Sequence, residues 1–172
     1  MILTKIQNVC IITVIVTVTL VFGFSGNIVL KVGDPAPFFE LKDQNDKTRR
    51  LSDYAEKRLV VYFFPMADTP GWIKEACGFR DVYGEYGKNN ITVLGISYDS
   101  PEALLSFKNK YELPFNFLFD HDRSVSEQYG AAGKFFPSRR TFVIAPDGNI
   151  ERIYESVNVN THAEQILEDL TK

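Results

Sequence analysis

The fold is decided by the stretch Leu59-Val60-Val61-Tyr62-Phe63-Phe64-Pro65-Met66-Ala67-Asp68-Thr69-Pro70-Gly71-Trp72-Ile73-Lys74-Glu75-Ala76-Cys77. Its first six residues form an unbroken apolar run, which is typical of a strand buried in a sheet. Thr69 is a favourable N-cap residue, and Pro70 suits the first helical position because its missing N–H leaves no hydrogen bond unmade there. The stretch therefore predicts a buried strand followed by a helix that runs to about Tyr86.

Strand and helix signals alternate on both sides of this stretch. A hairpin is expected first, with strands at 38–41 and 48–51 around a polar turn. After the central stretch we expect a buried strand at 91–97, a helix from Ser100-Pro101 to about Tyr111, a strand at 115–119, a short helix at 122–129, a second hairpin at 141–144 and 150–154, and a last helix that Thr161 and Glu164 open as a capping box. This order predicts an α/β thioredoxin-like sandwich with a central mixed sheet, flanking helices and an N-terminal hairpin.

The composition is that of one ordinary globular domain behind a leader. The chain has 172 residues, of which 45% are hydrophobic and 24% are charged, so it can bury a sizeable core. The net charge is −3, and Lys5 is the only charged residue of the leader, so residues 27–172 carry −4. This balance argues against nucleic acid or an anionic membrane surface as the partner, because both reward basic patches.

The first 26 residues differ from the rest of the chain. Lys5 precedes an apolar run at 9–24, which at 16 residues is shorter than the 18 or more that favour a membrane-spanning helix. A positive start and a run of this length are typical of a secretory signal peptide, and an uncleaved N-terminal anchor through residues 9–24 is the alternative. Either way we expect the domain at 27–172 to lie outside the cytoplasm, periplasmic or secreted, or anchored to the membrane.

Cysteine and histidine usage limits the chemistry. With the leader removed, Cys77 is the only cysteine, so no internal disulfide can form. The absence of a Cys-x-x-Cys pair weighs against a disulfide reductase. His121 and His162 lie far apart, without metal-ligand spacing, and each is expected at the surface. The cysteine and histidine positions therefore predict no metal site.

Residues 65–77 closely resemble the active-site segment of the peroxiredoxins, specifically the bacterioferritin-comigratory or Q-type subfamily. The family pattern is Pro, three residues, Thr, two residues and the peroxidatic Cys, with a resolving Cys five residues further on. Pro65, Thr69 and Cys77 match this pattern, and Trp72 occupies the peroxidatic position. The resemblance extends over nearly all of residues 31–172, with further matching segments at 32–38 and 137–142.

The resemblance also implies a mechanism and its partners. A peroxidatic thiolate attacks one oxygen of the peroxide, and a helix N-terminus and a nearby Arg favour its ionised form. Arg139, three residues before Phe142, matches the family's Arg, Thr69 would hydrogen-bond the peroxide, and Pro65 would limit water. The resemblance implies hydrogen peroxide and alkyl hydroperoxides as substrates, a thioredoxin-like reductant, no metal and no organic cofactor. We expect a monomer or weak dimer.

Trp72 contradicts this chemistry, because an indole has no thiol and cannot form a sulfenic acid. Its bulk should also fill the space between Thr69 and Arg139. Three hypotheses follow: a thiol peroxidase by descent that is inactive or impaired, a non-catalytic pseudoenzyme that binds a partner through an exposed Trp72 beside Phe135-Phe136, or redox activity at Cys77. Exposure of the indole discriminates between the first two, because a buried indole would be a plug.

Overall fold

The computed structural model describes residues 29–172. The predicted signal peptide or anchor at 1–26, including the apolar run at 9–24, lies outside the described residues. Within the described part of the chain, every helix is too short or too polar to cross a membrane.

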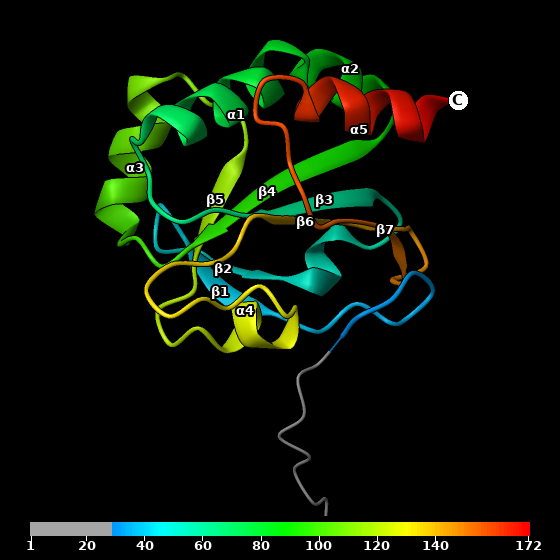
Figure 1. Ribbon diagram of the computed structural model, residues 1–172, viewed down its shortest axis with the longest axis horizontal. Coiled ribbons are helices and arrows are strands. Elements are labelled where there is room, and N and C mark those ends of the chain that lie inside the picture. The colour runs from blue at the N-terminus through cyan, green and yellow to red at the C-terminus, as the bar shows by residue number, and fades with distance from the viewer. Residues whose placement is uncertain (1–28) are drawn as a thin grey trace, which may run out of the picture.

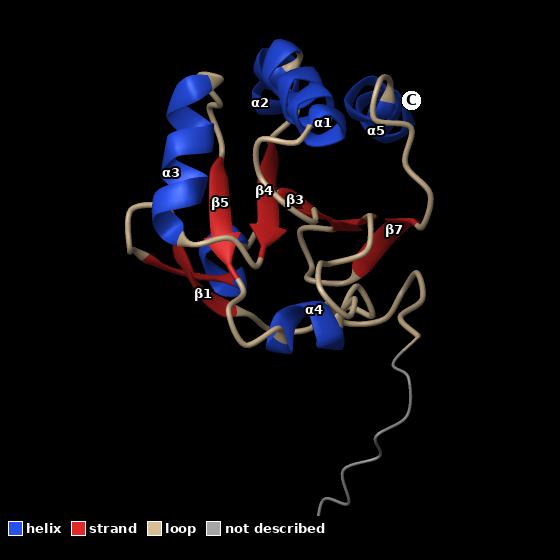
Figure 2. Cartoon of the chain, turned by 60° about the vertical axis from the view of Figure 1, so that its left-hand side comes forward, coloured by secondary structure: helices blue, strands red, loops and turns tan. Residues whose placement is uncertain are grey.

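The described residues build one seven-stranded mixed sheet with helices on both faces (Figures 1 and 2). The elements are β1 (Glu40–Asp43), β2 (Thr48–Arg50), the 3-10 helix η1 (Leu51–Tyr54), β3 (Arg58–Phe63), α1 (Pro70–Asp81), α2 (Tyr83–Lys88), β4 (Ile91–Ser97), α3 (Pro101–Lys110), β5 (Asn116–Phe119), α4 (Ser124–Gln128), β6 (Arg140–Ile144), β7 (Ile150–Tyr154) and α5 (His162–Thr171). The strand order is β2-β1-β5-β4-β3-β6-β7. The predicted α/β architecture with its N-terminal hairpin is therefore confirmed.

Strand β3 lies at the centre of the sheet, parallel to β4 and antiparallel to β6. Successive side chains of a strand point to opposite faces, so its apolar run serves two cores. Val60 and Tyr62 pack under α1, α2, α3 and α5, whereas Leu59, Val61 and Phe63 pack on the side of α4. Figure 2 shows α1, α2 and α5 above the sheet, α3 beside β5 and α4 below the sheet.

The first helix is shorter than predicted, since α1 ends at Asp81 and α2 begins at Tyr83. Val82 joins them with φ −105° and ψ 8°, outside the helical range. Gly84 and Gly87 are poor helix formers, which weakens any continuation of α1. The bend also buries Tyr86, whose hydroxyl donates a 2.7 Å hydrogen bond to the carbonyl of Ala163 in α5.

Of the helix N-caps predicted from the sequence, one makes its hydrogen bond and two do not. Ser100 accepts a hydrogen bond from the Ala103 N–H and caps α3 as predicted. Thr69 and Thr161 occupy the N-cap positions of α1 and α5, but neither side chain makes a cap hydrogen bond. The capping box expected between Thr161 and Glu164 is therefore wrong, because Thr161 has φ −135° and ψ 4° rather than the extended backbone that a box requires.

Candidate functional site

The candidate site lies where the chain leaves the carboxyl end of β3 and enters α1. Polar contacts of Ala67 and Asp68 hold the intervening loop. The Ala67 N–H donates to Asp99, which follows β4, at 2.5 Å. Asp68, whose φ of 61° is left-handed, accepts hydrogen bonds from Lys110 at 2.7 Å and from the Tyr111 hydroxyl at 2.6 Å. The Lys110 hydrogen bond holds the pKa of Asp68 below its ordinary value. The loop is thus positioned from α3 and from the end of β4.

Arg139 approaches the first turn of α1 closely. A Cβ at Gly71 would lie only 2.8 Å from one terminal nitrogen of the Arg139 guanidinium. Glycine at this position therefore allows the arginine to approach the helix. Thr69 lies beside it at the N-cap, and its hydroxyl donates a 3.3 Å hydrogen bond to the Met66 carbonyl. The predicted association of Thr69, position 72 and Arg139 at the helix start therefore exists in space.

Trp72 is buried, with 2% of its surface exposed. The central carbon of the Arg139 guanidinium lies 4.5 Å from the centroid of the indole, which is a cation–π contact. On the sheet side, the ring of Phe64 lies 5.5 Å away. The indole is enclosed between the sheet and an arginine, which is the arrangement of a plug. The exposed-Trp72 version of the binding-module hypothesis is therefore wrong.

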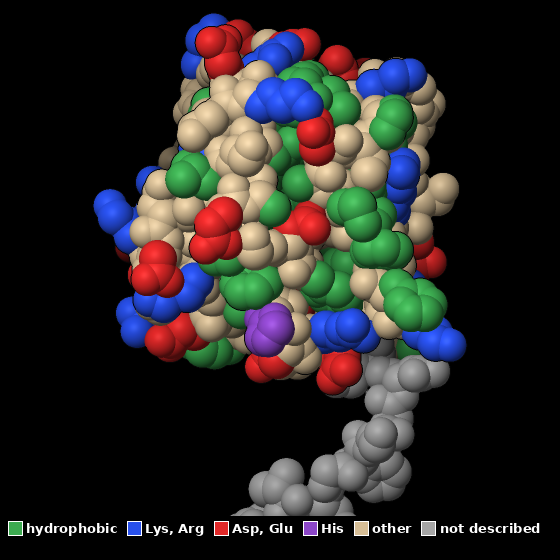
Figure 3. Space-filling model, turned by 90° about the vertical axis from the view of Figure 1, so that its left-hand side faces the viewer, with side chains coloured by type: hydrophobic (Ala, Val, Ile, Leu, Met, Phe, Trp, Pro, Cys, Tyr) green, Lys and Arg blue, Asp and Glu red, His purple; other side chains and the backbone are tan. Residues whose placement is uncertain are grey.

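The exposed aromatic residues nearby are Phe135 and Phe136, which are 67% and 44% exposed. Figure 3 shows hydrophobic side chains on the face that carries α3 and the loop before β6, dispersed among Lys and Arg. Lys134 lies over the Phe135 ring at 5.3 Å. This surface is separate from Trp72, whose ring faces inward.

Cys77 lies in α1, is partly buried and forms no disulfide. Five residues at 3.6 residues per turn place it about 140° around the helix axis from Trp72. The two side chains therefore point in different directions, and a bridge between positions 72 and 77 would require the helix to unwind. Pro65 is half-buried between the end of β3 and the loop that Asp99 holds.

A buried polar cluster lies under α1 and was not recognised from the sequence. It contains Glu75, His162 and Tyr62, with Thr141 on β6. His162 shares a 2.9 Å hydrogen bond with the Thr141 hydroxyl, and its ring nitrogen Nε2 is 4.0 Å from one Glu75 oxygen. The other Glu75 oxygen, the second nitrogen of His162 and the Tyr62 hydroxyl have no hydrogen-bond partner.

Burial dominates the electrostatics of this cluster. It raises the pKa of Glu75 to about 8, and the charge of Arg139 only partly opposes the rise. It lowers the pKa of His162 to about 4 and raises that of Tyr62 far above its ordinary value. All three groups are thus neutral near pH 7. The prediction that His162 lies at the surface is wrong, because its ring fills a gap between Phe79 and Tyr154.

The burial of Glu75 could have been predicted from the sequence. It lies on the same helical stripe as Trp72, Ala76 and Phe79, all of which are buried. An acidic residue in the middle of an apolar stripe at i, i+3 and i+4 spacing predicts a buried carboxyl group.

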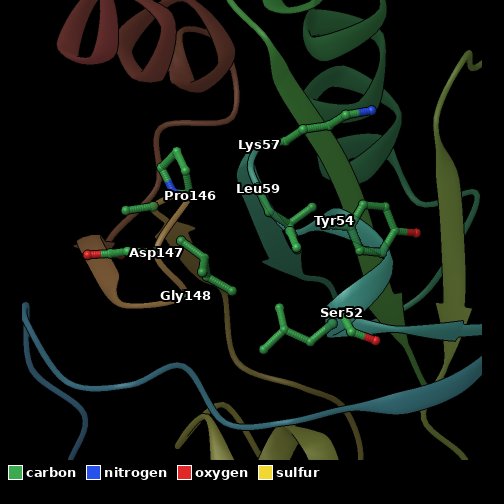
Figure 4. Close-up of a pocket in the computed structure, with 11 residues that line it drawn as sticks. Ser52, Tyr54, Lys57, Leu59, Pro146, Asp147 and Gly148 are labelled. Atoms are coloured by element: carbon green, nitrogen blue, oxygen red, sulfur yellow. The ribbon is translucent and has the colours of Figure 1, made fainter.

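A pocket lies at the other end of the sheet (Figure 4). It has a volume of about 170 Å³ and lies between η1, the start of β3 and the turn after β6. Its lining is mainly apolar and includes Leu51, Leu59, Ile144 and Pro146. Leu59 begins the buried part of β3, whereas the candidate site follows its carboxyl end, so this pocket and the site are separate. Among residues 29–172, no group of three or more His, Cys, Asp or Glu is arranged to hold a metal ion.

Comparison with known proteins identifies relatives along the whole described domain. The AhpC/TSA family matches residues 32–153. Peroxiredoxin Bcp of Escherichia coli K12 is 40% identical over 146 residues, which cover 80% of this chain and 94% of the relative. The crystal structure of peroxidoxin BcpB from Mycobacterium tuberculosis matches with a TM-score of 0.77 at 34% identity, over 83% of this chain and 97% of that one. A mutant of Xylella fastidiosa PrxQ matches with a TM-score of 0.79 at 29% identity, over 83% and 96%.

Proposed function

Because the chain belongs to the AhpC/TSA family, among peroxiredoxins of the Bcp and PrxQ type with a thioredoxin-like fold, we propose that it is a thiol peroxidase by descent whose peroxidatic position is plugged by Trp72. Its peroxidase activity is abolished or severely reduced, because no thiolate stands where the peroxide would be attacked. Trp72, Thr69, Pro65, Arg139 and Cys77 are the positions that correspond to the family's site.

The burial of Trp72 under Arg139 carries this proposal. In a working site, the helix N-terminus and the arginine would both stabilise a thiolate. Here the guanidinium is stacked on the indole instead, 4.5 Å from its centroid. The indole is 2% exposed, so it takes up the volume in which thiolate and peroxide would meet. The plug therefore removes the nucleophile and the space for the substrate together.

The substrate and reductant of the ancestral reaction follow from the family. They are hydrogen peroxide or an alkyl hydroperoxide, and a thioredoxin-like protein that reduces the oxidised thiol. The proposal needs no metal ion and no organic cofactor. Arg139 still lies over this position, whereas the Thr69 hydroxyl donates to the Met66 carbonyl, so the arginine of the site survives beside the plug.

A steady-state peroxidase assay tests the proposal. The purified protein, supplied with hydrogen peroxide, thioredoxin, thioredoxin reductase and NADPH, should consume NADPH no faster than its Cys77→Ser variant. Rapid turnover that disappears in Cys77→Ser would overturn the plugged-site proposal and make Cys77 the nucleophile.

We also propose that residues 1–26 direct the domain at 27–172 out of the cytoplasm, as a signal peptide or as an anchor through residues 9–24. The apolar run after Lys5 supports this proposal. Expression in a bacterial host followed by fractionation should find the protein in the periplasm or the membrane, and a wholly cytoplasmic protein would contradict it.

A further inference from the structure

Glu75 is the most unusual side chain of α1. Its residue is 2% exposed, it lies between Trp72 and Phe79 on the apolar face of the helix, and one of its carboxyl oxygens has no partner. An ionised carboxylate in such a place costs several kcal/mol, because desolvation is not offset by hydrogen bonds. Ionisation of this carboxyl group therefore disfavours the buried position of the first half of the helix.

The groups that face Glu75 do not neutralise a negative charge there. His162 on α5 is 4.0 Å away, and its buried ring stays uncharged at neutral pH. Tyr62 on β3 is fully buried and keeps its proton, and Thr141 on β6 contacts His162 rather than Glu75. Arg139, from the segment before β6, is the one cation that acts on Glu75 among the described residues, and it is stacked on Trp72.

The second half of α1 is packed more firmly against the rest of the protein than the first half. Ala76 and Phe79 are completely covered, and Gly78 packs against Ala163 of α5. The first turn contains Pro70 and Gly71, and no side chain caps it. Glycine in a helix and a missing cap each weaken the helix locally. The first half of α1 therefore depends on the burial of Trp72 and Glu75 themselves.

We propose that Glu75 is a proton-dependent latch, which holds the first half of α1 against the sheet while protonated and releases it on ionisation. Release brings Glu75 into water and uncovers Trp72. The second half of α1 and the sheet stay in place. The latch acts between neutral and mildly alkaline pH, and it does not depend on whether the peroxidase site is active.

Hydrogen–deuterium exchange with peptide-resolved mass spectrometry on the full chain tests the latch. The measured quantity is the protection factor, which corrects for the intrinsic effect of pH on amide exchange. From pH 6.5 to pH 9, protection of peptides from residues 70–77 should fall on the order of tenfold, because the open state ionises freely. Peptides from α3, at 101–110, should keep their protection.

Glu75→Gln is the matched variant, since it keeps the shape of the side chain and cannot ionise. Its protection at 70–77 should be independent of pH, and it retains Cys77, so the two proteins differ only at position 75. Glu85→Gln, which changes an exposed glutamate on α2, should behave as the unmodified protein. A pH-independent protection factor in the unmodified protein, or an equal fall in Glu75→Gln, would overturn the latch.

Infrared spectroscopy of the unmodified protein keeps the proposal testable if Glu75→Gln does not fold. The carbonyl stretch of a protonated carboxylic acid should disappear between pH 6.5 and pH 9, where exposed carboxyl groups are already ionised. Absence of that band at pH 6.5 would also overturn the latch.

Discussion

Two buried carboxyl groups on opposite sides of the sheet have opposite surroundings. Asp120, just before α4, accepts hydrogen bonds from the Val125 N–H at 3.2 Å, the Ser126 N–H at 2.8 Å and the Ser126 hydroxyl at 2.6 Å. Glu75, under α1, has a carboxyl oxygen without any partner. Buried polar groups normally have hydrogen-bond partners, so Asp120 has a structural role. Glu75 lacks such partners, and we propose that it holds the first half of α1 on the sheet only while it is protonated. The difference separates a rigid region from one that can open.

The largest effect expected from this comparison is the loss of Asp120. Asp120→Ala leaves the N–H groups of Val125 and Ser126 buried without an acceptor, and should lower the free energy of unfolding by about 3 kcal/mol. Urea denaturation measures the change. Asp122→Ala, at an exposed position beside it, serves as the control and should cost less than 1 kcal/mol. Equal losses in the two variants would remove the structural role assigned to Asp120.

The pH dependence of stability should come from Glu75. Its pKa of about 8 in the folded protein exceeds the ordinary value of 4.5, so the folded state holds the extra proton and stability falls as pH rises between these values. The pKa of His162 is lowered from 6.5 to about 4, so its contribution makes stability rise with pH between those values. From pH 6.5 to 8 the His162 slope fades and the Glu75 slope dominates, with a maximum of about 1.4 kcal/mol per pH unit.

We therefore expect the free energy of unfolding to fall by about 2 kcal/mol from pH 6.5 to 8. Urea titrations at four pH values across that window measure the change. The slope should vanish in Glu75→Gln. A Glu75→Gln protein that keeps the slope would assign it to another group.

The smallest effect concerns the N-caps of α3 and α1. As with the two carboxyl groups, one cap makes its hydrogen bond and the other does not. The Ser100 hydroxyl accepts from the Ala103 N–H, so Ser100→Ala should cost about 1 kcal/mol. The Thr69 hydroxyl makes no cap bond to α1, so Thr69→Ala should cost only a few tenths of a kcal/mol. Thermal unfolding of both variants checks the order, and a larger loss for Thr69→Ala would contradict it.

The sequence predicted most of the fold, because its apolar runs and turn signals are local. The strands at 59–64, 91–97 and 141–144 were each bounded by such signals, and all three share the sheet. The sequence did not predict the end of α1 at Asp81. The bend after it accompanies the hydrogen bond between Tyr86 and Ala163, which are far apart in the sequence. The Thr161 capping box failed because its backbone has the wrong geometry, which residue types alone do not reveal.

The candidate site was predictable only in part. The motif brought Thr69, position 72 and Arg139 together correctly, because resemblance to a family carries distant positions along with local ones. The ion pair between Asp68 and Lys110 and the contact between Glu75 and His162 join residues from different parts of the chain and have no local sequence signature. These contacts depend on tertiary packing, of the loop before α1 against the end of α3 and of α1 against α5.

The central claim is that Trp72 alone stands between this chain and peroxidase chemistry. The direct test is the thioredoxin-coupled peroxidase assay of Trp72→Cys, with Trp72→Ser as the blank and circular dichroism to confirm the fold of both. A cysteine at position 72 gains the helix terminus and Arg139 as stabilisers of its thiolate and Cys77 as its resolving partner. The account predicts turnover orders of magnitude above the Trp72→Ser blank, with a 72–77 disulfide in the oxidised protein after local unwinding of α1. Equal inactivity in the two folded variants would contradict it.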